Sequence, residues 1–89
     1  MNVGQLLAVA YILGREMRIT YDPQVDALYI RFVDEPVEVI THRLSEDVAV
    51  NYAPDGRIVG IEILDASEYV FPSVQERRIW VHNLEAVPA

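Results

Sequence analysis

Residues 47–64 read DVAVNYAPDGRIVGIEIL, and this stretch decides the fold. Two runs in which apolar and polar residues alternate, 47–52 and 58–64, flank a short polar segment. Asp55 and Gly56 lie in that segment. An Asp-Gly pair between two such runs is a strong hairpin signal, because glycine adopts the positive φ that the turn requires. The stretch therefore predicts two antiparallel strands joined by a turn at Asp55 and Gly56.

Three earlier runs have the same period of two, which is typical of β-strands. They cover residues 17–22, 27–33 and 37–42. Loops of about four to six residues join the five runs, and such short connections favour an antiparallel β-meander. We predict an α+β fold. Its small, mostly antiparallel sheet of about five strands is expected to carry an N-terminal helix and a short C-terminal helical segment.

The ends of the chain carry the predicted helices. Apolar residues recur at steps of three and four within residues 2–14, which indicates an amphipathic helix with a wide apolar stripe. Met17 can also serve as a translation start, so residues 1–16 are either this helix or an upstream extension. Residues 73–84 fit a helix or a strand, and we favour the helix.

A capping box is the predicted start of the C-terminal helical segment. Asp65 and Glu68 have the required spacing, with Asp65 capping the first turn and Glu68 reaching back to it.

Length and composition exclude several classes of protein. The chain has 89 residues, which is room for one domain. Its net charge of −7 disfavours direct DNA binding, since phosphate contacts need clustered positive charge. The absence of cysteine excludes disulfides and thiolate metal sites. The apolar run Leu6–Leu13 is far shorter than the about 20 residues of a membrane-spanning helix, so we expect a cytoplasmic protein without a membrane segment.

Two segments resemble a widespread family of small prokaryotic proteins known only as a domain of unknown function. The first is Tyr21-Asp22-Pro23 running into Asp26-Ala27-Leu28-Tyr29-Ile30-Arg31-Phe32. The second is Asp55-Gly56-Arg57-Ile58-Val59-Gly60-Ile61-Glu62-Ile63-Leu64-Asp65-Ala66-Ser67. The resemblance implies a compact β domain over about residues 17–67, preceded by residues 1–16 and followed by 68–89 as part of the same single domain. It brings no catalytic assignment. Members are similar to the products of small genes found beside toxin-like genes, and this resemblance implies an antitoxin or accessory role.

One candidate site is a polar cluster on a face of the predicted sheet. Strand alternation places five residues there: Arg18, Tyr29, Arg31, Asn51 and Glu62. If that face is covered, the Glu62 carboxylate needs a basic or donor partner. The alternative is a set of ordinary cross-strand pairs. A deep pocket lined by Glu62, Arg31 and Tyr29 would instead indicate a ligand-binding protein or an enzyme.

The remaining polar residues favour structural roles. We expect Asp22 to form an Asx turn before Pro23, and Asp26 to accept hydrogen bonds from backbone amides, rather than to form a metal or acid–base pair. The two histidines, His42 and His82, are too far apart in sequence for a typical zinc motif. We predict no metal, no cofactor and no catalytic set.

The only basic and aromatic cluster is formed by Arg77, Arg78, Trp80 and His82. It could contact an acidic partner or stack on RNA. We favour a solvated face around a buried tryptophan.

These observations favour a non-enzymatic protein-interaction module that binds a basic protein partner, as an antitoxin-like or accessory protein does. The alternatives are a ligand-binding protein or enzyme centred on Glu62, and a structural oligomerisation domain that uses residues 2–14. We also predict a homodimer, with the N-terminal helix or an edge strand at the interface, because so short a chain cannot cover both faces of its sheet.

Overall fold

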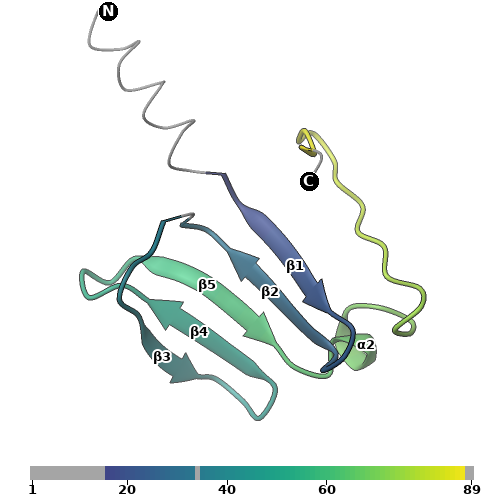
Figure 1. The fold of residues 1–89 in the computed structure, drawn as a ribbon, viewed down its shortest axis with the longest axis horizontal. Coiled ribbons are helices and arrows are strands. Elements are labelled where there is room, and N and C mark those ends of the chain that lie inside the picture. Colours follow the sequence, from purple (N-terminus) through teal and green to yellow (C-terminus); the bar gives the residue numbers. More distant parts are fainter. Residues whose placement is uncertain (1–15, 34, 88–89) are drawn as a thin grey trace, which may run out of the picture.

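The computed structural model describes residues 16–33 and 35–87, and the predicted helix over 2–14 lies outside them. The described chain folds into one five-stranded sheet with a single turn of helix at one end (Figure 1). Its elements are β1 (Arg18–Asp22), β2 (Ala27–Arg31), β3 (Ile40–Arg43), β4 (Val48–Tyr52), β5 (Ile58–Ile63) and α2 (Ala66–Tyr69).

The α+β prediction is wrong, because the described part of the chain is mostly β. The only helix within residues 16–33 and 35–87 is α2, with four residues. Residues 73–84 form neither helix nor strand. The large apolar side chains Ile79, Trp80, Val81 and Leu84 of this segment are all exposed, so a helix there would gain little stability from packing. Asn83 has a φ of 58° and also interrupts any regular repeat.

The sheet is entirely antiparallel, but it is not a simple meander. Its strand order is β1-β2-β5-β4-β3, so the β1–β2 hairpin packs against β5 rather than against β3 (Figure 1). The prediction of a continuous meander therefore holds only for β3, β4 and β5. The apolar sequence of β5, IVGIEI, suits the central position, where Val59 is almost fully buried.

Two apolar clusters form the core, and each lies near one end of the sheet. The first contains Leu28, Ala66 and Phe71, with Tyr21 and Ile63 packed around them. The second contains Val33, Ala53 and Val59, with Val37 against them. The first cluster thus attaches α2 and Phe71 to the β1–β2 end of the sheet.

The turn between β4 and β5 lies at Asp55 and Gly56. Gly56 has a φ of 91°, a conformation that side chains with a Cβ rarely adopt. The Asp55 carboxylate accepts a hydrogen bond from the Arg57 amide at 3.0 Å and pairs with the Arg57 guanidinium at 2.8 Å. Both contacts hold the pKa of Asp55 below its ordinary value, with the amide hydrogen bond as the largest cause.

The predicted capping box at Asp65 and Glu68 does not form. Asp65 adopts a left-handed conformation with a φ of 50°, and its side chain makes no capping hydrogen bond. Its backbone carbonyl accepts the Glu68 amide instead, at 2.9 Å. The left-handed backbone of Asp65 differs from the extended conformation in which a capping side chain reaches the first helical amides.

Residues 73–87, which we call the C-terminal arm, run beside β1 at the edge of the sheet (Figure 1). The Arg77 guanidinium lies 5.3 Å from the centre of the Tyr21 ring, and the Tyr21 ring meets Phe71 edge to face at 5.1 Å. These cation–π and aromatic contacts connect the beginning of the arm to β1.

None of the helices in the described ranges has the length and apolar character needed to cross a membrane.

Candidate functional site

Tyr29 and Asn51, two of the five predicted cluster residues, meet on one face of the sheet. The Asn51 side-chain amide donates a hydrogen bond to the Tyr29 hydroxyl at 3.0 Å. The Thr41 hydroxyl in turn donates to the Asn51 carbonyl oxygen at 2.7 Å. We call these three residues the Tyr29 bridge. It joins β2, β4 and β3 by crossing over β5.

Gly60 is the residue that allows the Tyr29 bridge to form. It is opposite Arg31 in β2 and Asn51 in β4. A Cβ added to Gly60 would collide with the Tyr29 hydroxyl and would lie 2.5 Å from the Tyr29 Cζ and 2.8 Å from the Ile30 carbonyl oxygen. The Tyr29 ring therefore occupies the space of the missing side chain.

The other predicted cluster residues do not join the bridge. Arg31 donates from Nε to the Val33 carbonyl and from Nη2 to the Glu35 carbonyl at 2.7 Å, so its guanidinium stabilises the chain after β2. Glu62 is opposite Tyr29 and Ala49 in register, is half-buried, and makes no side-chain hydrogen bond within residues 16–33 and 35–87.

Arg18 is opposite Arg31 at the end of the β1–β2 ladder. The five residues thus share a face without forming one cluster around Glu62.

Asp26 organises a second set of polar contacts, at the end of the sheet near α2. Its carboxylate accepts hydrogen bonds from the Tyr21 hydroxyl at 2.7 Å, the Ser67 amide at 3.1 Å and the Ser67 hydroxyl at 2.5 Å. Its backbone carbonyl accepts the Ala66 amide at 3.0 Å. Asp26 therefore connects the β1–β2 turn to the start of α2, across 41 residues of sequence.

These contacts shift the pKa values of both partners. Hydrogen bonds from Ser67 and Tyr21 hold the pKa of the Asp26 carboxyl below its ordinary value. The hydrogen bond to Asp26 raises the pKa of the Tyr21 phenol. Asp22, on the same turn, accepts the Gln24 amide at 2.9 Å, which is an Asx turn.

Acidic residues gather where the β3–β4 turn meets the end of β5. The Tyr69 hydroxyl donates to the Asp47 carboxylate at 2.5 Å, and this bond raises the pKa of Tyr69 to about 12. Burial and the neighbouring Asp47 raise the pKa of Asp65 above its ordinary value. Within the part of the chain that the structure describes, no group of His, Asp and Glu side chains could hold a metal ion.

Three of these features were missed by sequence reasoning. Only the strand register shows that Gly60 lies under the Tyr29 ring. A glycine inside an apolar strand was the available signal, because it often marks a close approach. The contacts of Ser67 with Asp26 and of Tyr69 with Asp47 join distant segments, and neither has a local sequence signal.

The tryptophan predicted to be buried is not. Trp80 is 83% exposed, and its ring lies 6.5 Å from that of His82.

The sheet and its two hydrogen-bond networks define a small antiparallel β-sheet protein whose described polar side chains mainly connect its strands. The chain belongs to the family described as "Protein of unknown function (DUF2283)", which matches residues 18–67. The resemblance to a family of unknown function is thereby confirmed over the sheet and the start of α2. Neither the curated proteins nor the solved structures gave a match to this chain.

Proposed function

We propose that this chain is a non-enzymatic protein-interaction module, and that its edge strand β3 pairs with a strand of a basic partner protein. The observation that carries the proposal is the exposure of β3. All four of its residues are exposed, and it lies at one end of the strand order, paired only with β4. An open strand edge presents unpaired backbone groups, which another chain can bind by β-strand addition.

The ladder between β3 and β4 defines which backbone groups face outward. The Leu44 amide donates to the Val48 carbonyl at 2.8 Å, in the same register that places Ile40 opposite Tyr52 and His42 opposite Val50. Hydrogen-bonded and non-hydrogen-bonded pairs alternate in an antiparallel ladder. The backbone groups of Ile40 and His42 therefore point toward β4, and those of Thr41 and Arg43 point toward the open edge.

The net charge favours a basic partner. The chain carries 14 acidic residues against seven basic ones, which gives it an attractive field for positively charged proteins. Complementary charge raises the association rate and orients the encounter, whereas the backbone pairing supplies a fixed register. An antitoxin-like protein that masks a basic toxin-like partner is one instance of this function.

Thr41→Pro is expected to abolish partner binding, because proline removes the outward N–H of Thr41 and leaves the bonds to β4 in place. Its control is Thr41→Val, which also loses the hydroxyl bond to Asn51 but keeps the N–H. The three tagged proteins are used for affinity capture from the cells of origin, with the bound proteins quantified by mass spectrometry.

We expect the wild type and Thr41→Val to retain one basic protein at equal stoichiometry, and Thr41→Pro to lose it by about tenfold or more. Circular dichroism checks that Thr41→Pro remains folded. Equal retention by all three proteins would contradict the role of β3, and a wild type that captures no basic protein would contradict the proposed function.

The alternative of an enzyme or ligand-binding protein centred on Glu62 gains no support, since the Arg31 guanidinium is bonded to two carbonyls away from Glu62.

A further inference from the structure

The face of the sheet opposite the Tyr29 bridge is apolar across all five strands. Residues that are opposite each other in register lie on the same face, as do residues two positions apart in one strand. One row of such residues crosses every strand and consists of Ile19, Ile30, Ile61, Val50 and His42. A second row crosses β5, β4 and β3, and consists of Ile58, Tyr52 and Ile40. We call the surface formed by these two rows the apolar face.

The part of the chain that the structure describes leaves the apolar face largely open. Ile58 is 45% exposed and Ile40 is 60% exposed. Helix α2 is the only described element outside the sheet, and with Phe71 it covers the neighbouring row at Leu28 and Ile63. Small domains bury their apolar surface between two packed layers, whereas the described residues supply only one layer here.

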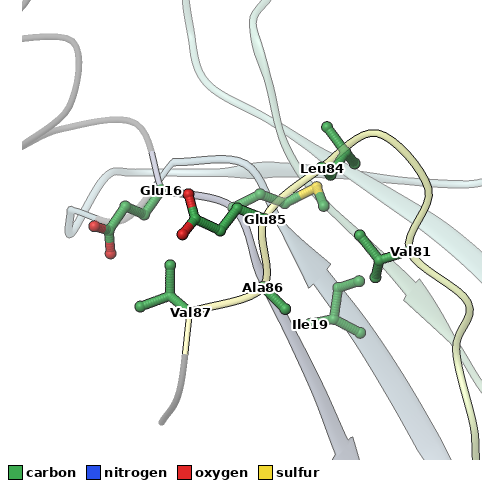
Figure 2. A pocket seen from close by; sticks show the side chains of 8 residues that line it. Glu16, Ile19, Val81, Leu84, Glu85, Ala86 and Val87 are labelled. Atoms are coloured by element: carbon green, nitrogen blue, oxygen red, sulfur yellow. The ribbon is translucent and has the colours of Figure 1, made fainter.

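The C-terminal arm lies at the β1 margin of the sheet and does not supply the second layer. A groove of about 490 Å³ lies between the arm and the start of β1, and Ile19, Val81 and Leu84 are among the side chains that line it (Figure 2). The arm stays on the outer side of β1 along its length (Figure 1). It therefore leaves β2, β5, β4 and β3 uncovered.

We infer that two copies of the chain pack their apolar faces against each other and form a two-layer β-sandwich. A two-fold interface uses the same surface of both copies. A sheet face meets this requirement directly, because two sheets stack about 10 Å apart with their strands roughly aligned. Side chains of the two faces interdigitate in such a stack, so no single projecting group has to match a cavity.

The charge distribution favours a second copy as the occupant. All the acidic residues and arginines of the five strands lie on the opposite face, although the chain as a whole has a net charge of −7. Two acidic copies repel each other least where their surfaces carry no charge. A basic protein partner would be drawn to the acidic remainder of the chain, and its cations would find no carboxylate on the apolar face.

The size of the face predicts a dimer of moderate affinity. Five strands about 4.8 Å apart and about five residues long cover about 400 Å² in each copy. The accessible surface of the side chains exceeds this flat area, so a stacked pair comes close to the about 1,000 Å² in total that a specific interface needs. We therefore expect a dissociation constant in the micromolar range.

Sedimentation equilibrium of the full chain over about 0.1–100 µM tests the inference. We expect the mass to rise from that of a monomer to that of a dimer within this range. A chain that stays monomeric throughout would overturn the inference.

Ile58→Glu places a charge on the apolar face at an exposed position, and we expect it to weaken dimerisation by about tenfold or more. Ile58→Thr keeps the β-branched shape that strands favour, and should weaken the dimer by about threefold or more. Val25→Glu is the matched control, since Val25 is 63% exposed on the β1–β2 turn, and it should leave the dimer unchanged. Circular dichroism checks that each variant remains folded. A dimer that resists both substitutions of Ile58 would contradict the inference.

A single thiol reports directly whether the apolar face is covered, because the chain has no cysteine of its own. The rate constant for the reaction with a maleimide is measured for Ile58→Cys and Val25→Cys at both ends of the concentration range. We expect Ile58→Cys to react about fivefold or more slowly at the high concentration, and Val25→Cys to react equally at both. An Ile58→Cys thiol that is equally protected in the monomer would show that its own chain covers the face, and would overturn the inference.

This inference and the proposed function fail separately. Stacked sheets keep their edges open, so capture of the basic partner at β3 and dimerisation through the apolar face are compatible. Thr41→Pro should leave the dimer intact, since Thr41 lies on the opposite face, and Ile58→Glu should leave capture of the basic partner intact. A dimer that is lost in Thr41→Pro and kept in Ile58→Glu would show that copies join through the β3 edge, and would overturn the inference.

Discussion

Gly60→Ala is expected to destabilise the protein by about 1–3 kcal/mol, in the upper part of that range. The new methyl group would collide with the Tyr29 hydroxyl and would lie 2.5 Å from the Tyr29 Cζ and 2.8 Å from the Ile30 carbonyl oxygen. The ring can move away at the cost of its hydrogen bond to Asn51, but the carbonyl belongs to the β2–β5 ladder and cannot. For a domain of this size the loss is a large part of the total stability.

Urea denaturation of the wild type and four variants tests this expectation. Tyr29→Ala is made alone and together with Gly60→Ala. The free energy lost through Gly60→Ala should be smaller in the Tyr29→Ala background than in the wild type, by the part that arises from the collision with the ring. Gly56→Ala is the control glycine: it has no atom within 4 Å of the added Cβ, so its cost comes from the φ of 91° alone. If Gly60→Ala destabilised the fold no more than a mild surface change does, the close approach of Tyr29 would be refuted.

Asn substitutions at Asp26 and Asp65 are expected to change stability in opposite directions. The two residues have nearly the same left-handed backbone, with φ values of 52° and 50°, and asparagine tolerates that conformation well. At neutral pH, Asp26→Asn should lower the melting temperature by several degrees, since an amide nitrogen cannot accept from the Ser67 hydroxyl. Asp65→Asn should raise it, because it removes a carboxylate whose charged form the fold disfavours.

The pH dependence gives each substitution a second readout. Folding lowers the pKa of Asp26, so its stabilising effect is complete above the unfolded value of about 3.9 and is lost as the pH falls through the lowered value. Folding raises the pKa of Asp65, so the wild type gains stability through this group as the pH falls through the raised value. The advantage of Asp65→Asn should therefore shrink toward acid pH. Calorimetry at neutral pH and near pH 4 follows the Asp65 effect, and a further measurement near about pH 2.5, below the ordinary value of about 3.9, follows the Asp26 effect. Shifts of the same sign at neutral pH would contradict the assignment.

The positions of the strands could be predicted from the sequence, but not the order in which the strands pair within the sheet. Alternation identified all five strands, although the third begins at Ile40 and not at Val37 as predicted. Asp55 with Gly56 identified the β4–β5 hairpin, because both signals are local. The pairing of β2 with β5 joins segments about 30 residues apart, and alternation defines only which face a residue occupies. The α+β prediction failed for a related reason: the spacing in residues 73–84 is a local pattern, and its apolar side chains remain exposed, so packing does not stabilise a helix there.

The candidate site was predictable to the same limited extent. Tyr29 and Asn51 were placed correctly on one face because a strand alternates with a period of two. Their contact depends on Gly60, and only the register of three strands reveals it. Arg31 does not join the expected cluster, because its guanidinium donates to two backbone carbonyls after β2. Such contacts with a loop have no sequence pattern.

The central position of β5 has a consequence for synthesis on the ribosome. The β1–β2 hairpin emerges first, but the strand that covers the inner edge of β2 is the last of the five to be made. Until β5 leaves the exit tunnel, the nascent chain therefore exposes β2 as an unprotected strand edge. Neighbouring nascent chains on one message can pair through such an edge, so faster translation of the region between β2 and β5 should reduce aggregation of the newly made protein.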